Sequence, residues 1–226
     1  MSSLDELGIK YGTDKASVYM KDGQEVNGHD YLRRYELFLR ELIDEEFTLV
    51  ELGVDKGASL KMWEEYFPKA FIIGVDLDPD VSRLDTDRIK CITADATSKD
   101  LPNTICKMLN GRAKCIIDDC SHAWSSQRIS MENLFPALLD SGGYYIVEDL
   151  GCNAMGAYPD QPPKILDSQR FFDYALDRMN ILRVSENLDP FRRRPYFLEL
   201  PESARMIESG LDMAIVIPGA IIFKKK

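Results

Sequence analysis

The chain lacks the features that mark membrane, secreted and nucleic-acid-binding proteins. No apolar run reaches the roughly 20 residues of a membrane helix, and the first ten residues are too polar for a secretory signal. The formal net charge is −10, and the one basic run, at residues 192–194, is either a solvated loop or a clamp for an anionic part of a substrate. The five cysteines are odd in number and show no CxxC spacing, as is typical of free thiols in a reducing compartment. We therefore expect a cytoplasmic protein whose partner is neither a membrane nor a nucleic acid.

The hydrophobic pattern predicts an α/β fold. With 226 residues and 45% hydrophobic content, the chain can bury the core of one globular domain. Short apolar runs alternate with segments of helical spacing, which indicates a parallel sheet made of βαβ units. Two late runs separated by Pro218 and Gly219 predict an antiparallel hairpin. The predicted strands are 47–52, 71–75, 89–93, 115–117, 144–147, 213–217 and 220–223, and the helices between them are 60–66, 104–109 and 125–139. The fold class we predict is a doubly wound, Rossmann-like sheet, mostly parallel, with a C-terminal antiparallel hairpin.

The beginning of the chain differs from this pattern. Polar residues and four glycines in the first thirty positions predict an irregular or partly helical arm, and a helix follows at 29–44. We interpret residues 1–45 as an arm and helix that cap a cofactor site and residues 46–226 as the catalytic domain, together one compact unit. The proline-containing segment 151–164 is a candidate lid, and 167–179 is a further predicted helix.

A glycine-containing turn follows the first predicted strand, with the spacing E-x-G-x-x-x-G from Glu51 to Gly57. Glycines permit a tight turn and close approach of the backbone to a ligand at a helix N-terminus. Asp55 is a poor neighbour for a pyrophosphate but a tolerable one for a sulfonium and an amino group. Asp76 ends the second strand, about 25 residues on, where a carboxylate can accept ribose hydroxyls. Asp95 ends the third strand, where a carboxylate can accept an adenine amino group, so we expect a nucleoside-containing cofactor at this edge.

Acidic residues also end the next two strands. Asp119 follows the fourth strand, and Glu148 and Asp149 follow the fifth. Clustered carboxylates repel one another unless a cation lies between them, and hard oxygen ligands without a thiolate cluster favour Mg²⁺, Mn²⁺ or Ca²⁺ over Zn²⁺. Neighbouring strand residues point to opposite faces, so Glu148 and Asp149 converge only if the chain turns there. The alternative is that one of them caps a helix or pairs with an arginine.

The chain has two histidines. His122 lies three residues after Asp119, where an imidazole could take a proton near neutral pH; the alternative is a structural histidine. His29 opens the 29–44 helix and is expected to be a capping or packing residue.

A set of short motifs, specific only in combination, resembles the class I S-adenosylmethionine-dependent sugar O-methyltransferases of macrolide and polyketide biosynthesis. The mycinamicin and rhamnosyl-tetracenomycin enzymes typify this family, and the macrocin O-methyltransferase and cephalosporin hydroxylase-like proteins are more distant. The matching residues are Tyr11 to Lys15, His29, Tyr31, Tyr35, Glu36, Glu51 to Gly53, Gly57, Ser59, Met62, Trp63, Tyr66 to Pro68, Ile117 to Asp119, Ser121, His122, Leu134 to Pro136 and Gly142 to Leu150. The chain departs from the family at Cys120, where glycine is usual, and in the segment after Asp149.

The resemblance implies S-adenosylmethionine, Mg²⁺ (or Mn²⁺), a sugar hydroxyl as the acceptor and a homo-oligomer. It implies that Asp119, Glu148 and Asp149 hold the metal, that His122 is the base, and that the Tyr11–Lys15 arm closes over the cofactor. The predicted cofactor-binding set is Tyr11, Thr13, Glu51, Gly53, Gly57, Ser59, Asp76, Asp95 and Ala96. Three alternatives stay open: a metal-independent methyltransferase acting on a phenol or carboxyl, a nicotinamide-dependent sugar oxidoreductase, and a non-catalytic nucleotide-binding accessory protein.

Overall fold

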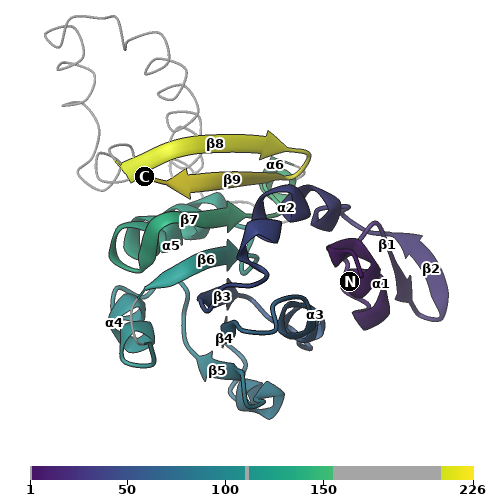
Figure 1. Ribbon diagram of the computed structural model, residues 1–226, viewed down its shortest axis with the longest axis horizontal. Helices are drawn as coiled ribbons and strands as arrows, with labels where there is room; N and C mark the ends of the chain where they lie inside the picture. Colours follow the sequence, from purple (N-terminus) through teal and green to yellow (C-terminus); the bar gives the residue numbers. More distant parts are fainter. Residues whose placement is uncertain (1, 110–111, 155–209) are drawn as a thin grey trace, which may run out of the picture.

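The fold is built on a seven-stranded sheet. The structure, a computed structural model, describes residues 2–109, 112–154 and 210–226. The strands are β3 (Thr48–Leu52), β4 (Phe71–Asp76), β5 (Ile89–Thr93), β6 (Ala113–Asp118), β7 (Leu139–Val147), β8 (Leu211–Ile217) and β9 (Ala220–Lys225). Their spatial order is β5-β4-β3-β6-β7-β9-β8 (Figure 1). The pairings from β5 to β7 are parallel, and those of β9 with β7 and β8 are antiparallel, which confirms the predicted fold class.

Helices lie on both faces of this sheet, and a small hairpin extends from one side (Figure 1). The helices are α1 (Leu4–Tyr11), α2 (Leu32–Leu39), α3 (Ala58–Tyr66), α4 (Leu101–Cys106), α5 (Trp124–Ala137) and α6 (Gly151–Ala154), and the hairpin is β1 (Val18–Lys21) with β2 (Gln24–Asn27). No helix among the described residues is long and apolar enough to cross a membrane.

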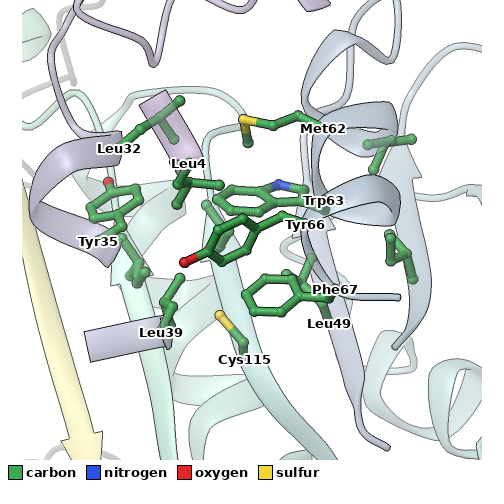
Figure 2. Close-up of a cluster of buried hydrophobic side chains, with 14 of the residues drawn as sticks. Leu4, Leu32, Tyr35, Leu39, Leu49, Met62, Trp63, Tyr66, Phe67 and Cys115 are labelled. Carbon is green, nitrogen blue, oxygen red and sulfur yellow. The ribbon is translucent and has the colours of Figure 1, made fainter. Parts of the chain in front are cut away.

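The core forms two layers because successive strand residues point to opposite faces of the sheet. Leu49 and Ile72 pack on the face that carries α1, α2 and α3, whereas Val50 and Ile73 pack on the face that carries α4 and α5. Figure 2 shows the first layer, in which side chains of α1 and α2 meet those of α3 above the sheet. The labelled members are Leu4, Leu32, Tyr35, Leu39, Leu49, Met62, Trp63, Tyr66, Phe67 and Cys115. The N-terminal helices therefore share a core with the sheet, and the division at residue 45 stays an interpretation.

The N-terminal arm is more regular than we predicted. Ser3 and Glu6 form a capping box that starts α1: the Glu6 backbone N–H donates to Ser3 Oγ, and the Ser3 N–H donates to Glu6 Oε2. The helix predicted at 29–44 begins only at Leu32, because Asp30 has a φ of 58°, which is incompatible with a helix. The predicted helix 167–179, the basic run 192–194 and all but the first four residues of the candidate lid lie outside the described residues.

The order of the strands creates a crevice at one edge of the sheet. From β3 the chain passes outward to β4 and β5, and it then returns to the other side of β3 to form β6 and β7. Between β3 and β6 the direction of winding reverses, and ligands of doubly wound folds bind at such a point, outside the carboxyl ends of the strands. The predicted site residues that lie at or directly after these strand ends are Gly53, Asp76, Asp95, Ala96, Asp119, Glu148 and Asp149.

Candidate functional site

The glycine turn after β3 packs directly against the backbone that follows β6. Gly53 has a φ of 80°, and its N–H donates to the Val75 carbonyl at 2.8 Å. A Cβ at this position would lie 2.3 Å from the backbone oxygen of Asp119. Only glycine fits both the left-handed backbone and the close approach of the two strand ends.

Beside this turn lies a pocket of about 350 Å³, which is within the size range of small-molecule sites. Its walls come from the carboxyl ends of β3, β4, β5 and β6 and from the beginning of α5. The lining residues are Gly53, Val75, Asp76, Leu77, Ala94, Asp95, Ala96, Thr97, Cys120, Ser121 and Ser126. Four of the predicted cofactor-binding residues, Gly53, Asp76, Asp95 and Ala96, therefore meet in one cavity.

The two acids of the pocket are oriented by backbone donors. Asp76 Oδ2 accepts hydrogen bonds from the N–H groups of Val54 and Asp55, at 2.9 and 3.3 Å. Asp95 Oδ1 accepts one from the Thr97 N–H at 2.8 Å. Leu77 lines the same pocket although the residue is 72% exposed, so it offers an apolar surface beside both acids.

The other five predicted cofactor residues lie outside the pocket lining. Glu51 and Ser59 are buried and hydrogen-bonded to each other at 2.9 Å, and Thr13 is also buried. Gly57 precedes α3, and the Tyr11 hydroxyl donates to Glu65. None of these five lines the pocket, and their assignment to the cofactor stays a prediction.

A buried lysine lies among the acids of the site. Lys15 is 2% exposed, and its ammonium donates to Asp119 and, at 2.7 Å, to Glu148 Oε2. Glu51 Oε1 lies 3.6 Å from the same nitrogen and has no hydrogen-bond partner among the described residues. The Tyr35 hydroxyl donates to the second oxygen of Glu148 at 3.1 Å. An ammonium ion thus occupies the centre of the acidic cluster.

One ammonium cannot neutralise three carboxylates. Burial by itself would lower the pKa of Lys15, but Asp119, Glu148 and Glu51 outweigh it and raise that pKa well above its ordinary value. Burial would raise the pKa of Asp119, but the charges of Lys15 and His122 lower it. At Glu148 burial outweighs Lys15, and the pKa is raised well above its ordinary value. Glu148 therefore holds a proton more tightly than an ordinary carboxyl, and a further cation beside the cluster would favour its charged form.

The pKa of Glu51 predicts a dependence of stability on pH. Burial, opposed only in part by Lys15, raises that pKa to about 7. Because the folded-state pKa exceeds the ordinary value, the stabilisation is complete below about pH 4.5 and is lost as the pH rises through 7. Between pH 4.5 and 8 the native chain should therefore lose roughly 3 kcal/mol of its free energy of unfolding, and Glu51→Gln, which has no group to ionise there, should not. Urea unfolding of both proteins at the two pH values would measure the difference. The exposed Glu46→Gln is the control, and an equal shift for both variants would contradict the assignment.

The imidazole of His122 lies between two acids. Its Nε2 is 3.1 Å from Asp119 Oδ1, and its Nδ1 is 3.6 Å from Asp149 Oδ2. Both His122 and Asp149 have a φ of 55°, an unfavourable backbone conformation for residues with a side chain. The chain does turn at the end of β7: Glu148 points to Lys15, and Asp149 points to His122.

Aromatic and imidazole groups from the N-terminal arm hold Asp149. The Tyr31 hydroxyl donates to Asp149 Oδ1 at 2.7 Å, and His29 Nδ1 lies 3.3 Å from the same oxygen. His29 is therefore part of the site and not only a packing residue. Sequence reasoning assigned no role to Tyr31 or Tyr35, and it placed Lys15 only in the arm that closes over the cofactor, because local spacing carries no sign that these residues reach the ends of β6 and β7.

Comparison with curated proteins identifies relatives of one chemical class. The chain is 33% identical over 172 residues to 8-demethyl-8-alpha-L-rhamnosyl tetracenomycin-C 2'-O-methyltransferase of Streptomyces olivaceus; the match covers 70% of this chain and 41% of the relative. It is 32% identical over 155 residues to L-olivosyl-oleandolide 3-O-methyltransferase of Streptomyces antibioticus, a match covering 65% of this chain and 36% of the relative. The chain thus spans less than half the length of these relatives. No protein-family profile matches the chain.

Solved structures with the same fold are also methyltransferases. The MycE methyltransferase of the mycinamycin biosynthetic pathway, in complex with Mg and SAH, superposes with a TM-score of 0.77 at 24% identity, covering 99% of this chain and 53% of MycE. The SAH-bound methyltransferase PaMTH1 of Podospora anserina superposes with a TM-score of 0.52 at 16% identity, covering 100% of this chain and 88% of PaMTH1. The resemblance that the motifs indicated is confirmed: the chain has the Rossmann-like fold of methyltransferases, and its curated relatives are sugar O-methyltransferases of polyketide and macrolide pathways.

Proposed function

We propose that this chain is an S-adenosylmethionine-dependent, divalent-metal-assisted O-methyltransferase that acts on a hydroxyl of a sugar or glycosylated natural product. One observation carries the proposal: the pocket lined by Gly53, Asp76 and Asp95 ends at Cys120 and Ser121, directly between Asp119 and His122 in the chain. A cofactor pocket and a candidate base therefore share one short segment after β6.

The chemistry of the pocket fits S-adenosylmethionine. Asp76 and Asp95 offer carboxylate oxygens for ribose hydroxyls and an adenine amino group, and the exposed Leu77 beside them offers an apolar contact for a planar base. When bound, this cofactor would supply a methyl group on a cationic sulfur. Holding the acceptor oxygen near that carbon would account for much of the acceleration.

In the proposed mechanism His122 removes the proton of the acceptor hydroxyl. Asp119 orients the imidazole through Nε2 and favours the imidazolium that forms when the proton is taken. Asp149, held by Tyr31 and His29, faces the other ring nitrogen. These residues hold and move the proton.

The three acids differ in how accessible their carboxyl oxygens are to a divalent cation. Asp119 and Asp149 are 21% and 12% exposed and can be reached, whereas Glu148 is 1% exposed and its oxygens accept from Lys15 and Tyr35. The grouping of carboxyl oxygens from Asp119, Glu148 and Asp149 at this edge supports a cation here, and a cation would stabilise the alkoxide forming on the acceptor. Glu148 would reach it only if its contact with Lys15 opens or water bridges the gap.

The acceptor and the setting are also proposals. The named relatives act on glycosylated small molecules, and the net charge of −10 supports a small-molecule acceptor over a nucleic acid or an anionic membrane surface. We propose a homo-oligomer in the cytoplasm, and light scattering of the purified chain would test its assembly.

Cofactor binding is the first test. S-adenosylhomocysteine at 100 times its dissociation constant should stabilise the chain by about 2.7 kcal/mol. NAD should not stabilise it, because Asp55 beside the glycine turn is a poor neighbour for a pyrophosphate. Thermal unfolding and calorimetry with each ligand would measure this. Binding of NAD in place of S-adenosylhomocysteine would favour the oxidoreductase alternative, and cofactor binding without turnover on any glycosylated acceptor would favour the accessory-protein alternative.

Metal removal is the second test. Methyl transfer should stop in EDTA and return with Mg²⁺ or Mn²⁺, and Asp149→Ala should abolish the return while S-adenosylhomocysteine still binds. The Lys15 ion pairs favour the competing candidate, a metal-independent methyltransferase, since an ammonium already neutralises part of the cluster. Full turnover in EDTA would establish that candidate.

A further inference from the structure

Three side chains at the edge of the site form a group of a different character from the acids around Lys15. Ligand atoms of His122, Asp149 and Cys152 all lie within 4.8 Å of one another. Cys152 stands in α6, and its N–H donates to the Asp149 carbonyl at 3.1 Å. Nitrogen, oxygen and sulfur donors in one group suit borderline metals such as Zn²⁺ and Co²⁺, whereas Mg²⁺ takes oxygen ligands.

We propose that His122, Asp149 and Cys152 form a binding site for a thiophilic divalent metal of the Zn²⁺ class. Ligands on one tetrahedral Zn²⁺ lie about 3.3–3.7 Å apart, given bond lengths of about 2.0–2.3 Å. The separation of His122 Nδ1 from Asp149 Oδ2, 3.6 Å, already falls in this range. The Cys152 sulfur lies within 4.8 Å of a ligand atom of each of the other two residues, so a small side-chain movement would bring it to the distance expected around one Zn²⁺.

A second observation supports the same assignment. His122 Nε2 lies 3.1 Å from Asp119 Oδ1, so Nε2 can carry the proton and donate it to this carboxylate while Nδ1 faces Asp149. A metal-bound histidine commonly donates its other N–H to a carboxylate, which sets its tautomer and orientation. Both residues have positive φ angles, and their side chains meet in this corner.

The site has a consequence that rests on the proposed function. A metal bound to Nδ1, with the proton on Nε2, leaves His122 no lone pair to accept a proton from the acceptor. The Cys152 thiol would release its proton to the buffer on binding, because the thiolate is the metal ligand. Zn²⁺ should therefore inhibit methyl transfer supported by Mg²⁺.

The test uses the full chain, reduced and stripped of metal, with Co²⁺ as a spectroscopic probe for Zn²⁺. The native chain and Cys106→Ser, the control at an exposed cysteine, should show thiolate-to-cobalt charge-transfer absorption, and Zn²⁺ should displace the Co²⁺. Cys152→Ser should lack that absorption and bind Zn²⁺ at least ~10²-fold more weakly, since loss of an outer-shell partner alone costs 10–100-fold. A Co²⁺ spectrum of the native chain without thiolate absorption would overturn the proposed site. Equal Zn²⁺ affinity of Cys106→Ser and Cys152→Ser would do the same.

Inhibition separates this proposal from the proposed function. Zn²⁺ should inhibit the native chain and Cys106→Ser at concentrations that match its measured affinity, and Cys152→Ser should need at least ~10²-fold more. Thiolate absorption in a chain without methyl transfer would support the site and refute the proposed function. Mg²⁺-dependent methyl transfer in a chain without thiolate absorption would refute the site and leave the proposed function intact.

Discussion

Replacement of His122 by alanine should reduce methyl transfer by ~10²–10⁴-fold, the usual contribution of a general base. His122 lies between Asp119 and Asp149 and directly follows the segment that ends the pocket, so its loss removes the proposed proton acceptor. Steady-state turnover and S-adenosylhomocysteine binding should be measured on the same preparation, because binding should be unchanged if only the chemical step is affected.

The second histidine provides a matched control. His29 also contacts Asp149, but it comes from the N-terminal arm and is 42% exposed. His29→Ala should cause a much smaller loss of turnover, since it removes one contact to Asp149 and no proton acceptor. Comparable losses in the two variants, or a folded His122→Ala with native turnover, would show that another group removes the proton.

The pH–rate profile tests the same role. The hydrogen bond to Asp119 raises the pKa of His122 above its ordinary value, although burial opposes this. A base must be neutral, so activity should fall as the pH drops through that pKa, and the ascending limb should lie above about pH 6.5. A nearby divalent cation disfavours the imidazolium, so raising the Mg²⁺ concentration should move the limb to lower pH. His122→Ala should lose the limb altogether.

Replacement of Lys15 by methionine should lower the free energy of unfolding by about 3–5 kcal/mol near pH 8, the usual cost of removing one partner of a buried ion pair. Methionine keeps much of the volume of the lysine but leaves Asp119 and Glu148 without their shared cation. Urea unfolding of the native chain and the variant would measure the difference.

The loss should be smaller near pH 5, because unpaired buried carboxyls then take up protons and stop repelling one another. Lys10→Met is the matched control: Lys10 pairs with Glu65 on the surface, where ion pairs contribute little, and its replacement should change stability only slightly. A Lys15→Met protein as stable as Lys10→Met at pH 8 would show that the acidic cluster is neutralised in another way.

Local pattern was sufficient for much of the fold. The apolar runs at 71–75 and 89–93 became β4 and β5 almost residue for residue, because a buried parallel strand needs a continuous apolar segment. Since parallel strands end at one edge, acids that follow them converge there, and Asp76 and Asp95 do line one pocket. The positive φ angle at Asp30 also shortened α2, a backbone detail that apolar spacing does not encode.

The sequence by itself determined the fold class, the glycine turn and the acids at the strand ends, since each depends on residues close together in the chain. Only the tertiary structure decided what surrounds those acids. Lys15 is 104 residues from Asp119 and 133 from Glu148, and Tyr31 is 118 residues from Asp149, so no local period relates them. They meet because α1 and α2 fold back onto α3 and bury a common apolar layer, and that packing carries the lysine and the tyrosine to the ends of β6 and β7.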